Sequence, residues 1–116
     1  MVNKTDYTPT QGEIVIVDIG RGKGHEPRGR RPYICLSNDL VSSFANTAIF
    51  APISTTARDY PLYIPLETGL VTEGVAMLDQ LVTIDYTARN AKYVETVSEP
   101  FLYRLLKTAA LIFQKN

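Results

Sequence analysis

The chain has 116 residues, and 45% of them are apolar, which is enough for one compact core and too little chain for two ordinary domains. Its 12 basic residues are balanced by 12 acidic residues, which excludes a protein that coats nucleic acid through its total charge. We therefore expect a single domain over residues 1–116, in which any nucleic-acid site is a local patch.

The first part of the chain predicts two strands joined by a long loop. Residues 13–19 are rich in β-branched side chains and almost continuously apolar, which is typical of a strand covered on both faces. Residues 20–31 contain four glycines and indicate a loop. A second strand is expected over 32–37, with Pro32 at its first position, where a missing N–H is tolerated. The connection 38–46 leaves room for a short helical turn.

The middle of the chain predicts shorter strands separated by polar turns. Pro65 places the strand over 62–66 at a sheet edge, because proline cannot donate a hydrogen bond to a neighbouring strand. Residues 75–84 form either one bent strand or two short ones, with the break at Asp79 and Gln80. The other expected strands cover 47–52 and 92–97.

The end of the chain predicts an amphipathic helix. Ser98 is a good N-cap, Glu99 suits the positive end of the helix dipole, and Pro100 fits the first turn. Apolar residues then recur at helical spacing: Phe101, Leu102, Leu105, Leu106, Ala109, Ile112 and Phe113. Strands followed by one helix indicate a mainly β protein with an α element, a small antiparallel barrel capped by a C-terminal helix.

The positive charge of this neutral chain is concentrated in the first long loop. Residues 21–31 carry five basic residues and one acidic residue, a net charge of +4, and the rest of the chain carries −4. Glycines let a backbone approach a phosphate closely, and arginines bind phosphate oxygens with a bidentate fork. We interpret the loop as an anion site; the alternative is a solvated loop whose charge only aids solubility.

The remaining chemistry of the sequence is sparse. Cys35 lies in an apolar run, and we interpret it as a small buried hydrophobe rather than a catalytic thiol. His25 is the only histidine, so no metal site can contain two, and we expect neither metal nor cofactor. The N-terminus lacks a signal-peptide core, and no apolar segment approaches the ~18 residues that span a bilayer. A cytoplasmic protein is therefore expected.

Four segments in order resemble the MazF/PemK family of toxins. The most specific is 24–32 (GHEPRGRRP), which runs into the predicted second strand. Residues 12–18 (GEIVIVD) resemble the first strand of the family, and 51–56 (APISTT), followed by 60–61, resemble its second loop. Residues 74–80 (GVAMLDQ) resemble its third motif. The resemblance implies an SH3-like antiparallel β-barrel with a C-terminal helix, the CcdB/MazF/PemK-like fold.

The resemblance also implies an activity and its partners. It implies a homodimeric, sequence-specific endoribonuclease that cleaves single-stranded RNA without a metal and leaves a cyclic phosphate and a 5′-hydroxyl. A MazE/PemI-like antitoxin would neutralise it. Such a reaction needs a base for the ribose 2′-hydroxyl, positive charge for the phosphorane, and a proton for the leaving oxygen.

Three residues are the candidates for the catalytic positions. Arg31 matches the catalytic arginine of the family, and we interpret it as an electrostatic clamp, because a guanidinium hardly ever releases its proton. Ser54 stands where the family usually has threonine, which preserves the hydroxyl but loses the methyl group that restricts its rotamer. If the match to the family motif is shifted by one residue, the hydroxyl of Thr55 takes this role instead. Glu26 is either the base or an anchor for the arginines, which would lower its pKa.

Other polar residues of the same motifs are candidates for RNA binding. Arginines would hold phosphates, whereas Asp79 and Gln80 have edges suited to unpaired bases; a plain turn between strands is the alternative for this pair. The RNA-binding candidates are His25, Arg28, Arg30, Thr55, Thr56, Arg58, Asp79 and Gln80. The runner-up function is a CcdB-like toxin that binds DNA gyrase without cleaving RNA, and a weaker one is an RNA binder without nuclease activity.

Overall fold

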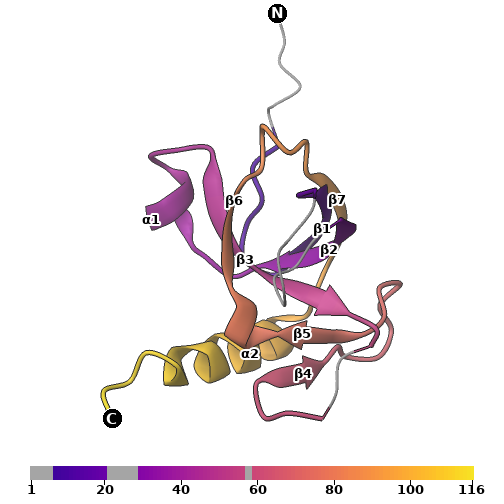
Figure 1. Ribbon diagram of the computed structural model, residues 1–116, viewed down its shortest axis with the longest axis vertical. Helices are drawn as coiled ribbons and strands as arrows, with labels where there is room; N and C mark the ends of the chain where they lie inside the picture. The colour runs from indigo at the N-terminus through magenta and orange to yellow at the C-terminus, as the bar shows by residue number, and fades with distance from the viewer. Residues whose placement is uncertain (1–6, 21–28, 57–58) are drawn as a thin grey trace, which may run out of the picture.

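The computed structural model describes residues 7–20, 29–56 and 59–116. Within them, seven strands form one antiparallel sheet with the order β4-β5-β3-β2-β1-β7, and β6 also pairs with β3 (Figure 1). The strands are β1 (Glu13–Asp18), β2 (Arg30–Cys35), β3 (Thr47–Ser54), β4 (Tyr63–Pro65), β5 (Val75–Met77), β6 (Val82–Asp85) and β7 (Lys92–Thr96). The helices are α1 (Asp39–Ser42), the 3-10 turn η2 (Leu78–Gln80) and α2 (Glu99–Leu111). The mainly β fold with a C-terminal helix is as expected.

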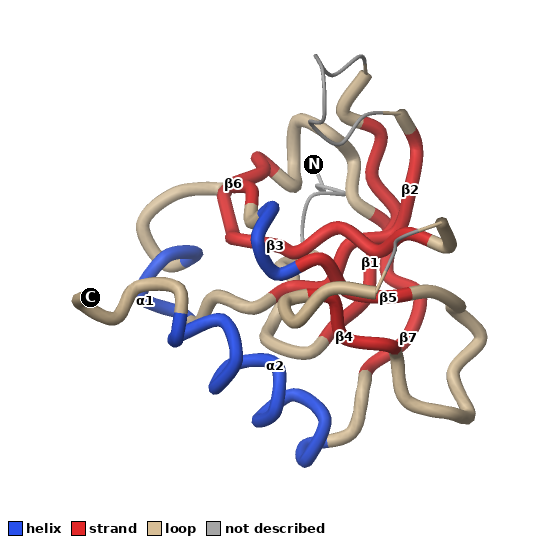
Figure 2. Tube along the Cα trace, turned by 60° about the horizontal axis from the view of Figure 1, so that its bottom comes forward, coloured by secondary structure: helices blue, strands red, loops and turns tan. Residues whose placement is uncertain are grey.

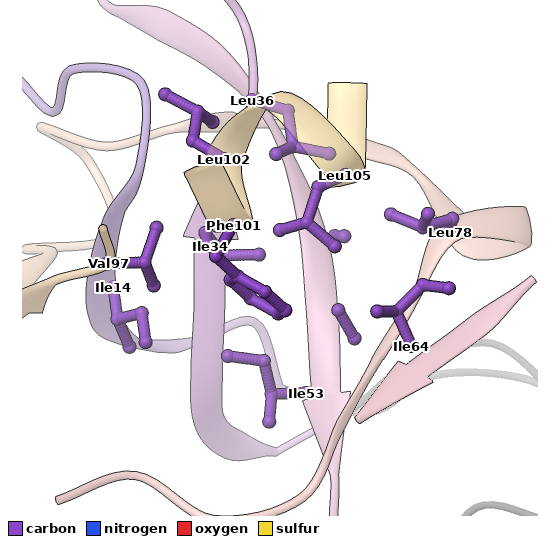
Figure 3. Packing of buried hydrophobic residues seen from close by; sticks show 12 residues of the cluster. Ile14, Ile34, Leu36, Ile53, Ile64, Leu78, Val97, Phe101, Leu102 and Leu105 are labelled. Carbon is purple, nitrogen blue, oxygen red and sulfur yellow. The ribbon is translucent and has the colours of Figure 1, made fainter. Parts of the chain in front are cut away.

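The central strands are buried on both faces, as the continuous apolar run of β1 predicted. Alternate residues enter two clusters, so that Ile14 and Ile34 face one side while Val15 and Tyr33 face the other. One cluster lies beneath α2, and Figure 3 shows Phe101 pointing from that helix toward the sheet. The other cluster, which includes Val17, Cys35, Phe50, Ile84 and Tyr86, lies on the opposite face. The sheet therefore separates two hydrophobic cores.

The local predictions at the termini of the helices are confirmed. The Ser98 hydroxyl accepts a hydrogen bond from the Phe101 N–H at 3.3 Å, so it caps α2. The connection before β3 holds the helical turn α1, which Asn38 caps. The helix ends at Leu111, so Phe113, the last apolar residue of the helical pattern, lies beyond it and is 75% exposed.

β2 and β3 differ by two residues from their predicted bounds, because of their neighbours. β2 begins at Arg30, so Pro32 lies within the strand and pairs with Ile16 of β1. β3 pairs with β2 only from Tyr33 onward, which leaves Pro32 with one paired neighbour. β3 extends beyond its predicted end to Ser54, because β5 pairs with its last two residues.

The remaining elements resolve the alternatives that the sequence left open. Residues 75–84 form the two short strands β5 and β6, separated by η2 at Asp79 and Gln80. β4, which ends at Pro65, lies at one end of the sheet, as its proline predicted. Cys35 is fully buried, and this burial raises the pKa of its thiol to about 11. A protonated, inaccessible thiol is a packing residue, as expected. No helix in the described part of the chain is long and apolar enough to cross a membrane.

Candidate active site

A cleft of about 290 Å³ opens where β2 and β3 separate. It brings together Arg31 from β2 and Ser54 from β3, the two residues that the sequence predicted to act as a pair. Arg30, Thr55 and Thr56, three of the predicted RNA-binding residues, also line it. The other lining residues are Gly29, Pro32, Ile53 and Glu73.

The strand register explains why Arg31 and Ser54 meet. Tyr33 pairs with Pro52, and extending this antiparallel register by two residues would set Arg31 directly opposite Ser54. Both side chains then project from the same face of the sheet, because side chains alternate with a period of two. The ladder stops before it reaches them, because Pro32 has no N–H to donate. The open end of the ladder is the cleft.

Gly74 fixes the outer wall of the cleft against Ser54. Its φ is +128°, a conformation that L side chains rarely adopt. A Cβ at this position would lie 2.5 Å from the backbone oxygen of Ser54. Only glycine therefore lets β5 approach the end of β3 and hold the backbone of Ser54 in place.

The Ser54 hydroxyl is held by a local turn. Its Oγ accepts a hydrogen bond from the Thr56 N–H at 3.1 Å and lies 3.2 Å from the Thr56 Oγ1. Ser54 is half-buried, whereas Thr55 and Thr56 are exposed. The turn restricts the rotamer of a serine that lacks the methyl group of threonine.

Arg31 is half-buried at the base of the cleft. Its Nε is shielded from solvent and has no hydrogen-bond partner among the described residues; the hydroxyl of Tyr33 is in the same situation. Burial raises the pKa of Tyr33 to about 12, although the charges of Arg31 and Arg89 act in the opposite direction. A buried donor without a partner is costly and concentrates at functional sites, which marks Arg31 as more than a surface cation.

The structure does not bring Asp79 and Gln80 to the cleft. They lie in η2, at the opposite end of β5 from its contact with Ser54, about 10 Å along the strand. Asp79 is exposed, and the Nε2 of Gln80 donates to the hydroxyl of Tyr63 at 3.2 Å. The pair therefore forms a separate polar surface. The predicted residues His25, Glu26, Arg28 and Arg58 lie outside the described residues.

Residues 10–113 match the family of PemK-like, MazF-like toxins of type II toxin–antitoxin systems. The chain belongs to this family. It is 33% identical to the endoribonuclease toxin MazF of Escherichia coli strain K12 over 92 residues. This match covers 79% of this chain and 82% of that protein. It is 30% identical over 100 residues to the endoribonuclease PemK of Escherichia coli, which covers 83% and 75%. The resemblance that the sequence motifs carried is thus confirmed.

Solved structures of the family have the same fold as this toxin. MazF of Deinococcus radiodurans matches it with a TM-score of 0.84 at 25% identity, over 93% of this chain and 98% of that one. The toxin fold also matches a MazE–MazF structure of Deinococcus radiodurans, with a TM-score of 0.79 at 22% identity, over 96% and 100% of the two chains. The MazF-like fold is therefore confirmed.

Glu73 is a cleft residue that the sequence did not predict. It is exposed and lies between Thr72 and Gly74, next to the third family motif. Nothing in the local sequence separates it from an ordinary loop acid. Its place in the cleft depends on the pairing of β5 with the last residues of β3, which is a long-range contact.

The loop that carries Glu73 is fastened to β7 by Glu95. The carboxylate of Glu95 accepts hydrogen bonds from the N–H of Val71 at 3.0 Å, the N–H of Thr72 at 2.8 Å and the hydroxyl of Thr72 at 2.6 Å. Burial raises the pKa of Glu95, but these three hydrogen bonds outweigh it, and the pKa is lowered overall. The charged form is the one that holds the loop.

Removing the charge of Glu95 should reduce the dependence of the protein's stability on acid pH. Because the pKa of Glu95 is lowered on folding, its contribution to stability is complete above its ordinary value of 4.5 and is lost as pH falls through the folded value. We expect Glu95→Gln to unfold at a lower temperature than the wild type at pH 7, and this difference to shrink as pH falls below 4.5. Thermal unfolding followed by circular dichroism measures it. Thr72→Val should weaken the same pH dependence, and a difference that is equal at every pH would contradict the assignment.

Proposed function

We propose that this toxin is a sequence-specific, metal-independent endoribonuclease that cleaves single-stranded RNA to a cyclic phosphate and a 5′-hydroxyl. The observation that carries the proposal is the cleft at the open end of the β2–β3 ladder, where Arg31 and Ser54 share one face. The named relatives of the chain are endoribonucleases, which supports the same reaction class. One domain over residues 1–116 is sufficient for it.

The bonds and protons of this reaction balance without water or a cofactor. The ribose 2′-oxygen attacks the adjacent phosphorus, its proton passes to a base, and the bond from phosphorus to the 5′-oxygen breaks as that oxygen gains a proton. Arg31 stabilises the charge that develops on the phosphorane, since its guanidinium keeps its proton. Ser54 donates or accepts a hydrogen bond at the same phosphate. Glu26 is the proposed base, and Arg30 positions the backbone.

Serine in place of threonine is compatible with this role. The hydroxyl needs a fixed direction to serve a phosphate, and threonine obtains it partly from its methyl group. Here the hydrogen bond from the Thr56 N–H and the neighbouring Thr56 hydroxyl supply that restriction instead. Position 54 can therefore serve the phosphate with the shorter side chain.

Loss of either cleft residue should abolish most of the cleavage. Purified wild-type protein should cut a long unstructured RNA in the presence of EDTA, and Arg31→Ala or Ser54→Ala should slow single-turnover cleavage by about 100-fold or more, because one phosphate-stabilising group is lost. Ser54→Thr should retain activity, and Arg104→Ala, which changes an exposed arginine of α2, is the matched control. Intact RNA with arrested gyrase would instead support the CcdB-like alternative, and RNA bound but uncut would support a binder without nuclease activity.

A MazE-like antitoxin is the proposed protein partner. The solved Deinococcus radiodurans structure with the same fold contains MazE together with MazF. An acidic segment of such a partner would compete with RNA for the arginines of the cleft, Arg30 and Arg31. The proposed inhibition thus uses the charge that binds the substrate.

A homodimer is the proposed assembly, and the exposed apolar side chains indicate where it forms. Leu40 and Phe44 at α1 are 77% and 85% exposed, and Phe113 beyond α2 is 75% exposed. Figure 2 shows both α-helices in blue, and two separate grooves lie beside them. Leu40 and Phe44 line the groove between α1 and the start of α2. The groove along the later turns of α2 is lined by Leu36, Ile49, Leu81, Leu106, Ala109 and Phe113, among others. Exposed apolar side chains gathered at such grooves are typical of an interface.

Polar substitutions on this surface should separate the two copies. We expect sedimentation velocity to show a wild-type dimer, and Phe44→Ser combined with Phe113→Ser to shift the protein toward monomer, because apolar contact area is lost. Val71→Ser, which changes a residue of 83% exposure on the loop before β5, should leave the dimer intact. A wild-type monomer at all concentrations, or a dimer that ignores the double substitution, would contradict the assembly.

A further inference from the structure

Glu73 gives the cleft a feature that phosphate binding does not explain. It is the only carboxylate that lines the cleft within the described part of the chain, and it lies in the same pocket as Arg30 and Arg31. A negative charge beside a phosphate weakens the binding of that phosphate. A cleft that only held RNA backbone would gain from a neutral or basic residue at this position. The carboxylate therefore suits a different part of the substrate.

The position of Glu73 is fixed on both sides of the residue. On one side, Thr72 is held by two hydrogen bonds to Glu95 of β7. On the other side, the carbonyl of Gly74 accepts a hydrogen bond from the Leu66 N–H at 3.0 Å, and its Cα packs against the backbone of Ser54. The residue is exposed, but its backbone is anchored at both ends. The backbone of Glu73 is thus held near the Ser54 end of the cleft.

The bases of single-stranded RNA offer the groups that a carboxylate accepts. Unpaired bases are recognised on their Watson–Crick edges. On that edge guanine presents two adjacent donors, its ring N–H and its amino group, which match the two oxygens of a carboxylate. Uracil presents one ring N–H between two carbonyl oxygens, and both of these oxygens repel a carboxylate. A carboxylate therefore discriminates more strongly between guanine and uracil than between any other two bases.

We propose that Glu73 is a specificity-determining residue that accepts hydrogen bonds from the Watson–Crick edge of a base beside the scissile phosphate, favouring guanine and rejecting uracil there. The proposal rests on the proposed ribonuclease function and deepens it, because it assigns one base position of the substrate. Glu73 takes no part in the proton transfers. Ser54 and Arg31 act on the phosphate while Glu73 selects the nucleotide next to it.

Short RNAs that differ in one base test the proposal. The strongest cut site on a long unstructured RNA is mapped first, and each nucleotide flanking the cut is then replaced by all four bases in short oligonucleotides. We expect kcat/KM of the wild type to favour guanine over uracil by about 10-fold or more at one flanking position, the range of a good bidentate contact. Glu73→Gln should remove most of this ratio, because its amide can also bind a uracil carbonyl. Glu73→Asp should keep the order of preference, and Glu99→Gln, which changes an exposed acid at the start of α2, should leave the guanine-to-uracil ratio unchanged.

Two results would overturn the proposal. One is a guanine-to-uracil ratio that Glu73→Gln leaves unchanged; the other is an equal loss of kcat/KM for all four bases, which would place Glu73 in the chemistry. The same oligonucleotides with a 2′-deoxy sugar at the cut site lack the nucleophile and report binding alone. If the wild type cuts no RNA, the proposed function fails, whereas binding of short single-stranded RNAs that prefers guanine over uracil and depends on Glu73 still supports this inference, and its absence overturns it.

Discussion

The cleft exists because the β2–β3 ladder ends early. Pro32 cannot donate a hydrogen bond, so the two strands part just beyond Tyr33 and Pro52. Arg31 and Ser54 are the pair that this register would join two residues further along, and both line the cleft instead. A substrate phosphate in that space would meet a guanidinium and a hydroxyl fixed by the same sheet, which is the preorganisation that electrostatic catalysis requires.

The surrounding contacts set the precision of this opening. Gly74 allows β5 to lie against Ser54, and Glu95 ties the preceding loop to β7, at the far end of the sheet. The two cores on opposite faces hold β1 to β3 rigidly, since each alternate side chain is buried. In a chain with no net charge, the proposed anion site thus depends on local architecture rather than on total charge.

The sequence predicted much of the fold, because local signals carried it. Ser98 capped the helix as expected, and Pro65 lay at a sheet edge. The family motifs also predicted that Arg31 and Ser54 act together. The sequence could not predict positions that depend on long-range pairing. Glu73 reaches the cleft only through the register of β5 with β3. Gln80, a candidate RNA contact from the third family motif, lies at the other end of β5.

The central claim is that Arg31 and Ser54 stabilise one phosphate together. A double-mutant cycle measures this directly, using single-turnover RNA cleavage by wild type, Arg31→Ala, Ser54→Ala and the double variant. If both groups serve the same transition state, the double variant should lose far less than the product of the two single losses. Losses that multiply fully would show that the two residues act independently, and would contradict the account.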